Sequence, residues 1–434
     1  MLDLEVGAPG HGGFCIARAA GRVVFVRHAL PGETVRAVVT EDGGKSFCRA
    51  DAIEVVHASP HRVAPPCPHA GPGRCGGCDW QHASAPAQRR LKAEVVREQF
   101  RRLAGLELDL PEVEALPGGL LGWRTRVSYA VGPDGAVGLH RHRSTELEPV
   151  VSCPLGVPEV AEARRAPGEA TGIETVRGDG EHDGVREVTV LAHRPGPGRQ
   201  ARGRRPPDRV EAVGGPEVVH HRLGDRLFAH AAAGFWQVHP HALEAFAGAV
   251  LEALAPAPGE TALDLYAGAG PLTAVLAEAV GPHGRVVGLE SAQSAVTDAE
   301  ANLVDLPWAQ VRRARVDPAA LYNQDIVELR PDIVVLDPPR AGAGEATMAA
   351  ILDLAPRAIG YVSCDPATLA RDVAVATRRG WTLRRLRAFD AFPMTHHIEC
   401  VATLVKGAST PSAADIRRDT ASSQVREHGG ARTL

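Results

Sequence analysis

From about residue 241 onward, the sequence alternates between short apolar β-prone segments and segments with helical periodicity. Strands joined through helices lie parallel, because each helical crossover returns the chain to the same end of the sheet. The alternation therefore predicts an α/β fold with a doubly wound, mostly parallel sheet over residues 241–407. We expect strands at 261–266, 285–289, 310–315, 333–336, 358–363, 381–389 and 398–405, and helices at 241–254, 272–279 and 292–303.

The remaining regions have different patterns. Between residues 1 and 58, β-prone segments are separated by glycine-rich turns, which predicts a small β-barrel of the OB type. Residues 59–240 mix a helical pattern with strand patterns and predict an α+β central domain. The stretch 408–434 is polar, has no periodicity and is predicted to be a disordered tail.

Two basic segments lie in the predicted central domain. The helix predicted over 87–104 has one apolar face, and its basic residues lie mostly outside that face. We expect these basic residues to be solvated, with RNA contact as the alternative; they are Arg89, Arg90, Lys92, Arg97, Arg101 and Arg102. Residues 194–209 consist largely of Pro, Gly and Arg, which predicts a flexible basic loop that contacts phosphates or a disordered insertion.

Composition restricts the possible locations and partners. The net charge of −4 does not by itself indicate a nucleic-acid partner, and no run approaches the roughly 20 apolar residues of a membrane helix. The start of the chain lacks the apolar core of a signal peptide, so we expect a cytoplasmic protein. We also expect a monomer. In that compartment the eight cysteines are expected to be metal ligands, nucleophiles or buried thiols.

Cysteines cluster in a segment that is rich in glycine and proline. Cys67, Cys75 and Cys78 fall within twelve residues, and Cys153 is the best candidate for a fourth ligand. Ligation by four cysteines suits zinc or an iron–sulfur cluster, and the spacing does not choose between them. Free buried thiols are the alternative. The remaining candidates, Cys15, Cys48 and Cys400, are expected not to be ligands.

Polar residues follow three of the predicted parallel strands. The first strand runs into Asp264-Leu-Tyr-Ala-Gly-Ala-Gly270, and Glu290 ends the next strand. Glycines allow close backbone approach to a ligand, and an acid at this position can hold ribose hydroxyls. A third glycine in the dinucleotide pattern is missing, which favours S-adenosylmethionine over a dinucleotide. Asp337, followed by two prolines, ends the fourth strand and is expected to face the same pocket.

A cysteine ends the strand predicted at 358–363. Cys364 precedes a helical stretch, and the amide dipoles of that helix are expected to favour a thiolate. The alternative is a buried cysteine that serves as a small apolar residue. Glu399 lies in a late β segment that could return to the same sheet edge, although a surface glutamate is the simpler interpretation.

From about Leu4 to Lys406 the chain resembles the RNA uracil-5 methyltransferases. The matching motifs are Cys75-Gly-Gly-Cys-Asp-Trp-Gln-His82, Gly234-Phe-Trp-Gln-Val238, the turn at 264–270, Asp337-Pro-Pro-Arg340, Ser363-Cys-Asp-Pro366 and His397-Ile-Glu399. The resemblance implies that the barrel is an RNA-binding TRAM domain. It also implies a four-iron–four-sulfur cluster held by Cys67, Cys75, Cys78 and Cys153. The implied cofactor and pocket residues are Gln237, Tyr266, Gly268, Gly270, Glu290, Asp317 and Asp337.

The resemblance further implies a reaction. A methyl group passes from S-adenosylmethionine to carbon 5 of a uridine in tRNA or ribosomal RNA, with Cys364 as nucleophile on carbon 6 and Glu399 as general base. Two other functions are considered. A cytosine-5 or other RNA-base methyltransferase is chemically close, because a cytosine enzyme also uses a cysteine. A metal-bearing RNA-binding protein with a vestigial methyltransferase fold is disfavoured by the presence of both Cys364 and Glu399.

Overall fold

The computed structural model describes residues 1–44, 46–131, 137–150, 152–157, 189–194, 209–214, 218–232 and 234–407. Most of the predicted basic loop, 195–208, and the predicted tail, 408–434, lie outside these residues. The chain forms two compact units. Unit 1 comprises 1–95, 114–245 and 390–397, and unit 2 comprises 96–113, 246–389 and the chain from 398. The domain boundaries at 58 and 240 therefore stay predictions.

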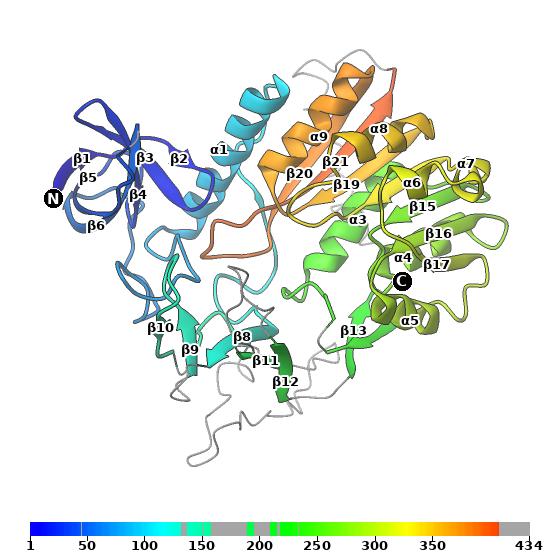
Figure 1. The fold of residues 1–434 in the computed structure, drawn as a ribbon, viewed down its shortest axis with the longest axis horizontal. Helices are drawn as coiled ribbons and strands as arrows, with labels where there is room; N and C mark the ends of the chain where they lie inside the picture. Colours follow the sequence, from blue (N-terminus) through cyan, green and yellow to red (C-terminus); the bar gives the residue numbers. More distant parts are fainter. Residues whose placement is uncertain are drawn as a thin grey trace, which may run out of the picture. The chain divides into compact units, whose positions relative to one another are not determined.

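Unit 1 begins with a six-stranded sheet in the order β1-β5-β6-β4-β3-β2, coloured blue in Figure 1. Most neighbours are antiparallel, and β4 pairs with β6 in parallel. Burial alternates along β3 and β5, so each strand gives one side to a core that also contains Trp80 and Leu91. The strands are β1 (Leu2–Glu5), β2 (Pro9–Gly10), β3 (Phe14–Ala19), β4 (Arg22–Arg27), β5 (Thr34–Glu41) and β6 (Phe47–His57).

The rest of unit 1 holds two further sheets. One has the order β10-β9-β8-β11-β12, and the other is the hairpin β13-β14. The predicted hairpin between β8 and β9 is antiparallel, with Ala130 opposite Gly138. The strands of these two sheets are β8 (Arg126–Val131), β9 (Val137–His140), β10 (Leu147–Glu148), β11 (Thr189–Arg194), β12 (Arg209–Gly214), β13 (Val218–Leu223) and β14 (Arg226–Ala231), whereas the short strand β7 (Glu114–Ala115) belongs to neither.

Helix α1 (Ala85–Ala104) corrects one expectation about the basic residues. Lys92 was expected to be solvated, but its side chain is 1% exposed and forms an ion pair with Asp390. The apolar spacing predicted the helix correctly. It could not show that the side of the helix that carries Lys92 is also buried. Leu103, expected on the apolar face, is 38% exposed.

Unit 2 contains the predicted mostly parallel sheet, whose strands follow the order β17-β16-β15-β18-β19-β21-β20. Neighbours from β17 to β19 are parallel, whereas β21 is antiparallel to β19 and β20. The strand order changes direction between β15 and β18: successive strands are added on one side of β15 up to β17, and then on the other side from β18 onward. Open α/β sheets bind ligands at such a switch point. The strands are β15 (Thr261–Leu265), β16 (Arg285–Glu290), β17 (Ala309–Arg313), β18 (Ile333–Leu336), β19 (Ala358–Ser363), β20 (Trp381–Asp390) and β21 (Glu399–Lys406).

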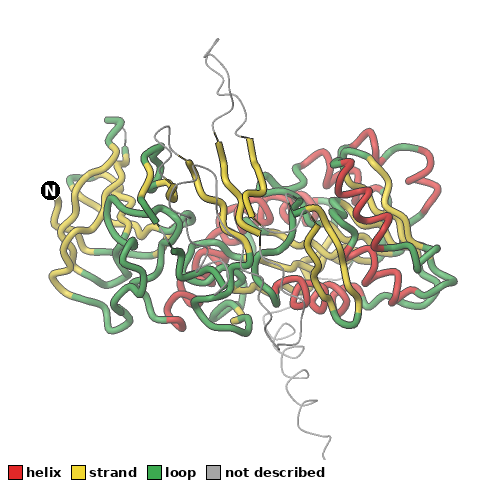
Figure 2. The backbone as a smooth tube through the Cα atoms, turned by 90° about the horizontal axis from the view of Figure 1, so that it is seen from below, coloured by secondary structure: helices red, strands yellow, loops and turns green. Residues whose placement is uncertain are grey.

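Helices of unit 2 cover this sheet (Figure 2, red). Helices α4 and α5 pack on β15–β17, and α9 packs on β21 and α8. The expected helices match α3 (Ala242–Leu254), α4 (Pro271–Val280) and α5 (Gln293–Asn302), and α9 (Pro366–Arg378) begins where the helical stretch after Cys364 was expected. Three short helices were not anticipated, because they lack several periodic turns; they are α6 (Pro318–Leu321), α7 (Gln324–Leu329) and α8 (Glu345–Asp353). Within the described residues, none of the helices has both the length and the apolar character of a membrane span.

Candidate active site

Cys364 lies at the carboxyl end of β19, directly after a strand in which every residue is buried. The neighbouring strand β21 runs antiparallel, and Ser363 is paired with Cys400. Cys364 and Glu399 are the residues next to this last pair, and Glu399 lies close enough to raise the pKa of the Cys364 thiol. Two predicted site residues that are 35 positions apart in the sequence are therefore brought together by one strand pairing.

The Cys364 thiol is half-buried at the start of α9. Burial and the nearby Glu399 raise the pKa of the Cys364 thiol to about 12. These groups favour the thiol, whereas the sequence predicted a thiolate stabilised by the helix N-terminus. The charge of Asp365 adds to the rise in the pKa, and Oδ1 of Asp365 accepts hydrogen bonds from the amides of Ala367 (2.9 Å) and Thr368 (3.0 Å). This cap uses the amides that were expected to favour the thiolate.

Glu399 is not the surface residue that the sequence favoured, since only 3% of it is exposed. Burial raises the pKa of Glu399 well above its ordinary value, and the negative charge of Asp337 adds to this effect. A carboxylate whose pKa is raised is a stronger base when it is ionised. Arg340 opposes the shift and also lowers the pKa of Cys364.

Asp337 follows β18 and faces the same group of residues. Its backbone amide donates to the carbonyl of Leu265 (3.2 Å), which ties the start of the loop to the adjacent strand β15. The residue is partly exposed, but protein atoms surround its carboxyl group. Burial, together with the charge of Asp264, raises the pKa of Asp337 to about 7.

The loop after Asp337 is held by a carboxylate that sequence reasoning missed. Asp372, buried in α9, accepts hydrogen bonds from the hydroxyl of Tyr361 (2.6 Å) and from the amides of Ala343 (2.8 Å) and Gly344 (3.2 Å). Gly342, with φ of +78°, approaches this carboxylate so closely that a Cβ would lie 2.8 Å from its Oδ2. The available signal was an aspartate on the apolar face of a helix.

The glycine turn after β15 adopts the backbone that the motif predicts. Gly268 and Gly270 have φ of +56° and +87°, and Tyr266 has φ of +67°. Glu290, at the end of β16, accepts from the amide of Gly268 (3.1 Å) and from that of Ala292 (2.7 Å). The Glu290 carboxylate therefore connects the glycine turn to the start of α5 by hydrogen bonds. Burial raises the pKa of Tyr266 to about 12.

Asp264 is a second site residue whose role the sequence did not reveal. It is 1% exposed and accepts a hydrogen bond from the hydroxyl of Thr273 (2.6 Å). Its other oxygen is buried without a hydrogen-bond partner among the described residues. Burial raises the pKa of Asp264 to about 7. A buried unpaired oxygen beside the glycine turn is suited to receive a donor from a ligand.

Two further predicted residues have different surroundings. Asp317 caps α6, with Oδ1 accepting from the amide of Ala320 (3.0 Å), so its carboxylate already has a structural role. Gln237 is half-buried in unit 1, in a hollow that Trp236, His221 and His230 also line. The indole of Trp236 stacks on both imidazole rings, with centroids 4.8 and 4.9 Å away.

The four predicted metal ligands also come together in unit 1. Cys67, Cys75, Cys78 and Cys153 all line one small cavity, and Gln81 accepts from the Cys67 amide (3.1 Å). Among the described residues, no three His, Cys, Asp or Glu side chains are arranged as a ready metal site. The thiols are therefore gathered around a common space without having the geometry of ligands.

The barrel carries an aromatic cluster on partly exposed positions. The rings of Phe14 and Phe25 have centroids 4.7 Å apart, and those of Phe25 and Phe47 are 5.4 Å apart. The guanidinium of Arg49 lies over all three rings, at 5.4 to 6.0 Å from their centroids. Aromatic rings combined with arginine form surfaces on which nucleic-acid bases stack.

Comparison with known proteins agrees with these features. A model of the tRNA (uracil-5-)-methyltransferase family matches residues 232–407, and a TRAM domain model matches residues 1–49. The 23S rRNA (uracil(1939)-C(5))-methyltransferase RlmD of Shewanella baltica is 32% identical over 442 residues, covering 92% of this chain and 95% of that protein. The chain belongs to the RNA uracil-5 methyltransferase family.

Other relatives extend over the same length. An RNA methyltransferase of Streptomyces avermitilis, described as uncharacterized, is 45% identical over 428 residues, covering 94% of this chain and 98% of that protein. The Pyrococcus abyssi tRNA (uracil-54, C5)-methyltransferase, solved with S-adenosyl-L-homocysteine, has a TM-score of 0.62 and 21% identity over 93% of this chain and 100% of its own. That likeness supports the fold. This uracil-5 methyltransferase therefore acts on RNA, uses S-adenosylmethionine, and carries a TRAM domain at its N-terminus.

Proposed function

We propose that this enzyme methylates carbon 5 of a uridine in tRNA or ribosomal RNA through a covalent adduct between Cys364 and carbon 6 of the base. The observation that carries the proposal is the β19–β21 pairing, which ends at Ser363 and Cys400 and brings the neighbouring residues Cys364 and Glu399 close together. A nucleophile and a base must reach two adjacent carbons of one ring, and residues at the ends of two paired strands are suited to that requirement.

Cys364 performs the first step. Its sulfur bonds to carbon 6 while its proton passes to a carboxylate of the site, for which Asp337, with a pKa raised to about 7, is suited. The electrons of the carbon 5–carbon 6 double bond move into an enolate, which makes carbon 5 nucleophilic. Because the pKa of the free thiol is about 12, substrate must be present before a useful fraction of thiolate forms.

Glu399 performs the last step. It removes the proton that remains on carbon 5 after methylation, the double bond re-forms, and the sulfur of Cys364 is expelled. Burial of Glu399 supports this role, because it raises the pKa of the carboxylate and excludes competing water. A uridine in a folded RNA must leave its stack to reach these residues.

S-adenosylmethionine supplies the electrophilic methyl group when it is bound. The residues of unit 2 fit such a nucleoside: the left-handed glycines of the turn admit close approach, Glu290 can accept from ribose hydroxyls, and Asp264 offers a buried unpaired oxygen. Tyr266, Asp317 and Asp337 are proposed to complete the pocket, and Gln237 is proposed as a further cofactor-binding residue.

A four-iron–four-sulfur cluster is proposed for Cys67, Cys75, Cys78 and Cys153. The cavity that these four thiols share supports it, because four cysteines are the usual ligand set of such clusters. Bound there, the cluster would hold the surrounding loop in place. The proposed partner is RNA, contacted in part by the Phe14–Phe25–Phe47 cluster, and the proposed state is a cytoplasmic monomer.

The substrate can be tested by mass spectrometry of nucleosides from a strain that lacks the gene. We expect 5-methyluridine to fall in either tRNA or ribosomal RNA and to return when the wild-type protein is supplied. Cys364→Ser should not restore it, whereas the control Cys400→Ala, on the neighbouring strand, should. Unchanged 5-methyluridine in both RNA classes, or a loss of 5-methylcytidine instead, would refute the proposed substrate.

A further inference from the structure

Residues Asp390–His397, here called the linking segment, join β20 to β21. Glu399 is the first residue of β21 and follows the segment after one intervening residue. The linking segment belongs to unit 1, although the strands on both sides of it belong to unit 2. The chain therefore reaches Glu399 directly from a stretch that belongs to unit 1.

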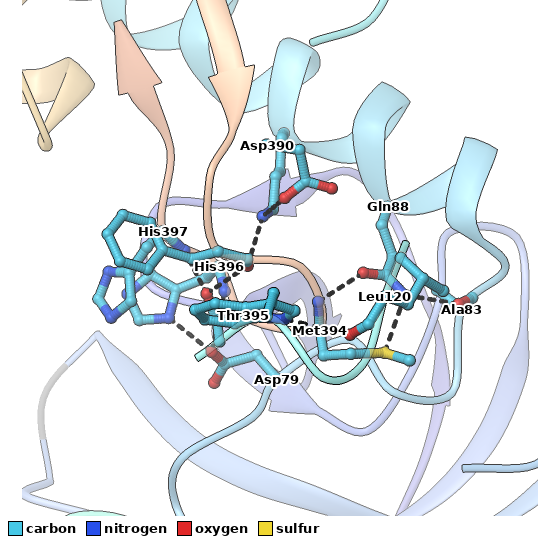
Figure 3. Close-up of polar contacts among 12 residues, drawn as sticks. Asp79, Ala83, Gln88, Leu120, Asp390, Met394, Thr395, His396 and His397 are labelled. Atoms are coloured by element: carbon cyan, nitrogen blue, oxygen red, sulfur yellow. Dashed lines mark hydrogen bonds and ion pairs between the residues drawn. The ribbon is translucent and has the colours of Figure 1, made fainter. Parts of the chain in front are cut away.

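The main chain of Met394 is held on both sides (Figure 3). Its carbonyl accepts from the amides of Asp79 (3.0 Å) and Trp80 (2.9 Å). Its own amide donates to Oε1 of Gln88 (2.8 Å), a residue on α1 that is fully buried. These bonds fix the middle of the linking segment against the loop that carries Cys78 and against the first turns of α1.

The Asp79 carboxylate holds the end of the segment nearest to Glu399. Its Oδ2 accepts from the amide (3.1 Å) and from Nδ1 (2.6 Å) of His396, and its Oδ1 accepts from Arg27 (3.2 Å). Only 5% of the Asp79 side chain is exposed. Gly13 approaches so closely that a Cβ there would lie 2.5 Å from Cγ of Asp79. One carboxylate therefore connects the barrel, the cysteine-bearing loop and the linking segment.

Lys92 holds the other end. Its ammonium donates to Oδ1 of Asp390 (2.6 Å) and to the carbonyl of Phe392 (3.0 Å), and both charged side chains are at most 3% exposed. Lysine occurs at only 3 of the 48 basic positions of the chain. A compact ammonium satisfies two close acceptors here, whereas a planar guanidinium needs a wider fork of acceptors.

Apolar packing continues the same connection. Met394 belongs to the buried cluster that contains Cys153, and Cys78 and Phe392 pack against that cluster. The ring of Phe392 meets the indole of Trp123 edge-on, with centroids 6.0 Å apart. The linking segment is thus part of the core that surrounds two of the proposed cluster ligands.

We propose that Asp79 and Lys92 are positioning residues for the reaction, because they hold the linking segment and thereby set where Glu399 stands relative to the base. The proposal rests on the proposed role of Glu399 as general base. A base must lie within hydrogen-bond reach of the proton it removes, and a displacement of about 1 Å is costly. Loss of either residue should therefore slow proton removal and release of Cys364, while leaving attack and methylation fast.

The test uses the full-length enzyme, S-adenosylmethionine and RNA substrate with hydrogen or deuterium at carbon 5 of uridine. For Asp79→Asn and Lys92→Arg we expect release of methylated RNA to slow by about 10- to 100-fold, with accumulation of the RNA–protein adduct. The deuterium isotope effect on turnover should exceed that of the wild type. A merely destabilised protein would lose active molecules without any change in this isotope effect.

The matched control is Glu33→Gln. Glu33 is also buried, and it forms a carboxylate–arginine pair with Arg62 (2.6 Å) in the barrel of unit 1. The amides of Leu30 and Ser59 also donate to its carboxylate, which thus bonds to residues outside the linking segment. This variant should show the isotope effect and adduct level of the wild type. Equal adduct levels and isotope effects in Asp79→Asn, Lys92→Arg and the wild type would overturn the proposal. If Asp79→Asn does not fold, Lys92→Arg still decides the question.

Glu399→Gln, measured in parallel, separates this inference from the proposed function. An adduct in Glu399→Gln but in neither positioning variant would refute the inference alone. If Glu399→Gln forms no adduct, the assignment of the base fails, and hydrogen exchange of residues 390–400 decides the inference. Faster exchange in Asp79→Asn than in Glu33→Gln supports a holding role, and identical exchange refutes it.

Discussion

At the scale of single residues, the reactive thiol is protected rather than activated in the free protein. Burial and Glu399 raise the pKa of Cys364, so the thiolate is scarcer at neutral pH than for an ordinary cysteine. A thiol whose pKa is raised reacts slowly with electrophiles at neutral pH, because only the thiolate is nucleophilic.

We therefore predict a steep pH dependence for alkylation of Cys364 by iodoacetamide. In the folded, ligand-free protein the rate should keep rising by about tenfold per pH unit from pH 7 to beyond pH 10, since the thiolate fraction rises in proportion. In the urea-unfolded protein the rate should level off above the ordinary thiol pKa of about 8.5. Peptide mass spectrometry of the Cys364 peptide gives both rates. A plateau below pH 9 in the folded protein would mean that the thiolate is stabilised after all.

At the scale of elements, the cap of α9 links stability to reactivity. Asp365 satisfies two amides at the start of the helix, and its charge also raises the pKa of Cys364. Removal of the Asp365 side chain should have two effects. The helix loses its cap, which lowers stability, and the freed amides at the helix N-terminus can stabilise the thiolate of Cys364.

Asp365→Ala should accordingly lower the stability of the protein by about 0.5–2 kcal/mol. At the same time, it should speed alkylation of Cys364 at pH 8. The control Asp365→Asn keeps the cap oxygen and removes the charge, so its stability should stay closer to that of the wild type. Thermal unfolding and alkylation rates measure the two effects. Unchanged alkylation in Asp365→Ala would show that the helix N-terminus has no influence on the thiol.

Sequence patterns predicted the elements that have regular periodicity. The strand–helix alternation after residue 241 predicted the parallel sheet, and the polar residues after its strands marked Glu290, Asp337 and Cys364. What could not be predicted depends on tertiary contacts. Glu399 and Lys92 have sequence surroundings typical of exposed residues, yet both are buried by segments distant in the chain. The use of the α9 amides by Asp365 is likewise a matter of side-chain geometry rather than of spacing.

At the scale of the whole molecule, unit 1 combines the barrel, the four clustered cysteines and the linking segment that leads to Glu399. Unit 2 combines Cys364, the glycine turn and β21 with Glu399. The chain crosses between the units several times, so the two cannot be separated by cutting the sequence at one position.

Iron and sulfide analysis tests the proposed iron–sulfur cluster of unit 1. Protein purified without oxygen should be brown and contain about four iron and four sulfide per chain. Cys153→Ala should lose most of this iron, because it removes one of the four thiols of the shared cavity. Cys48→Ala, in the barrel core, should keep it. One zinc per chain without iron, or equal iron in both variants, would contradict the assignment.

The most direct test of the central claim traps the covalent intermediate. Glu399→Gln should still allow attack and methylation, but it should not remove the proton from carbon 5, so methylated RNA should stay bonded to Cys364. On a denaturing gel this predicts a slowly migrating RNA–protein band in Glu399→Gln that is missing from the Cys364→Ala/Glu399→Gln double variant. A band that persists without Cys364 would contradict the account by showing that another residue is the nucleophile. Normal turnover in Glu399→Gln without any adduct would contradict the assignment of the base.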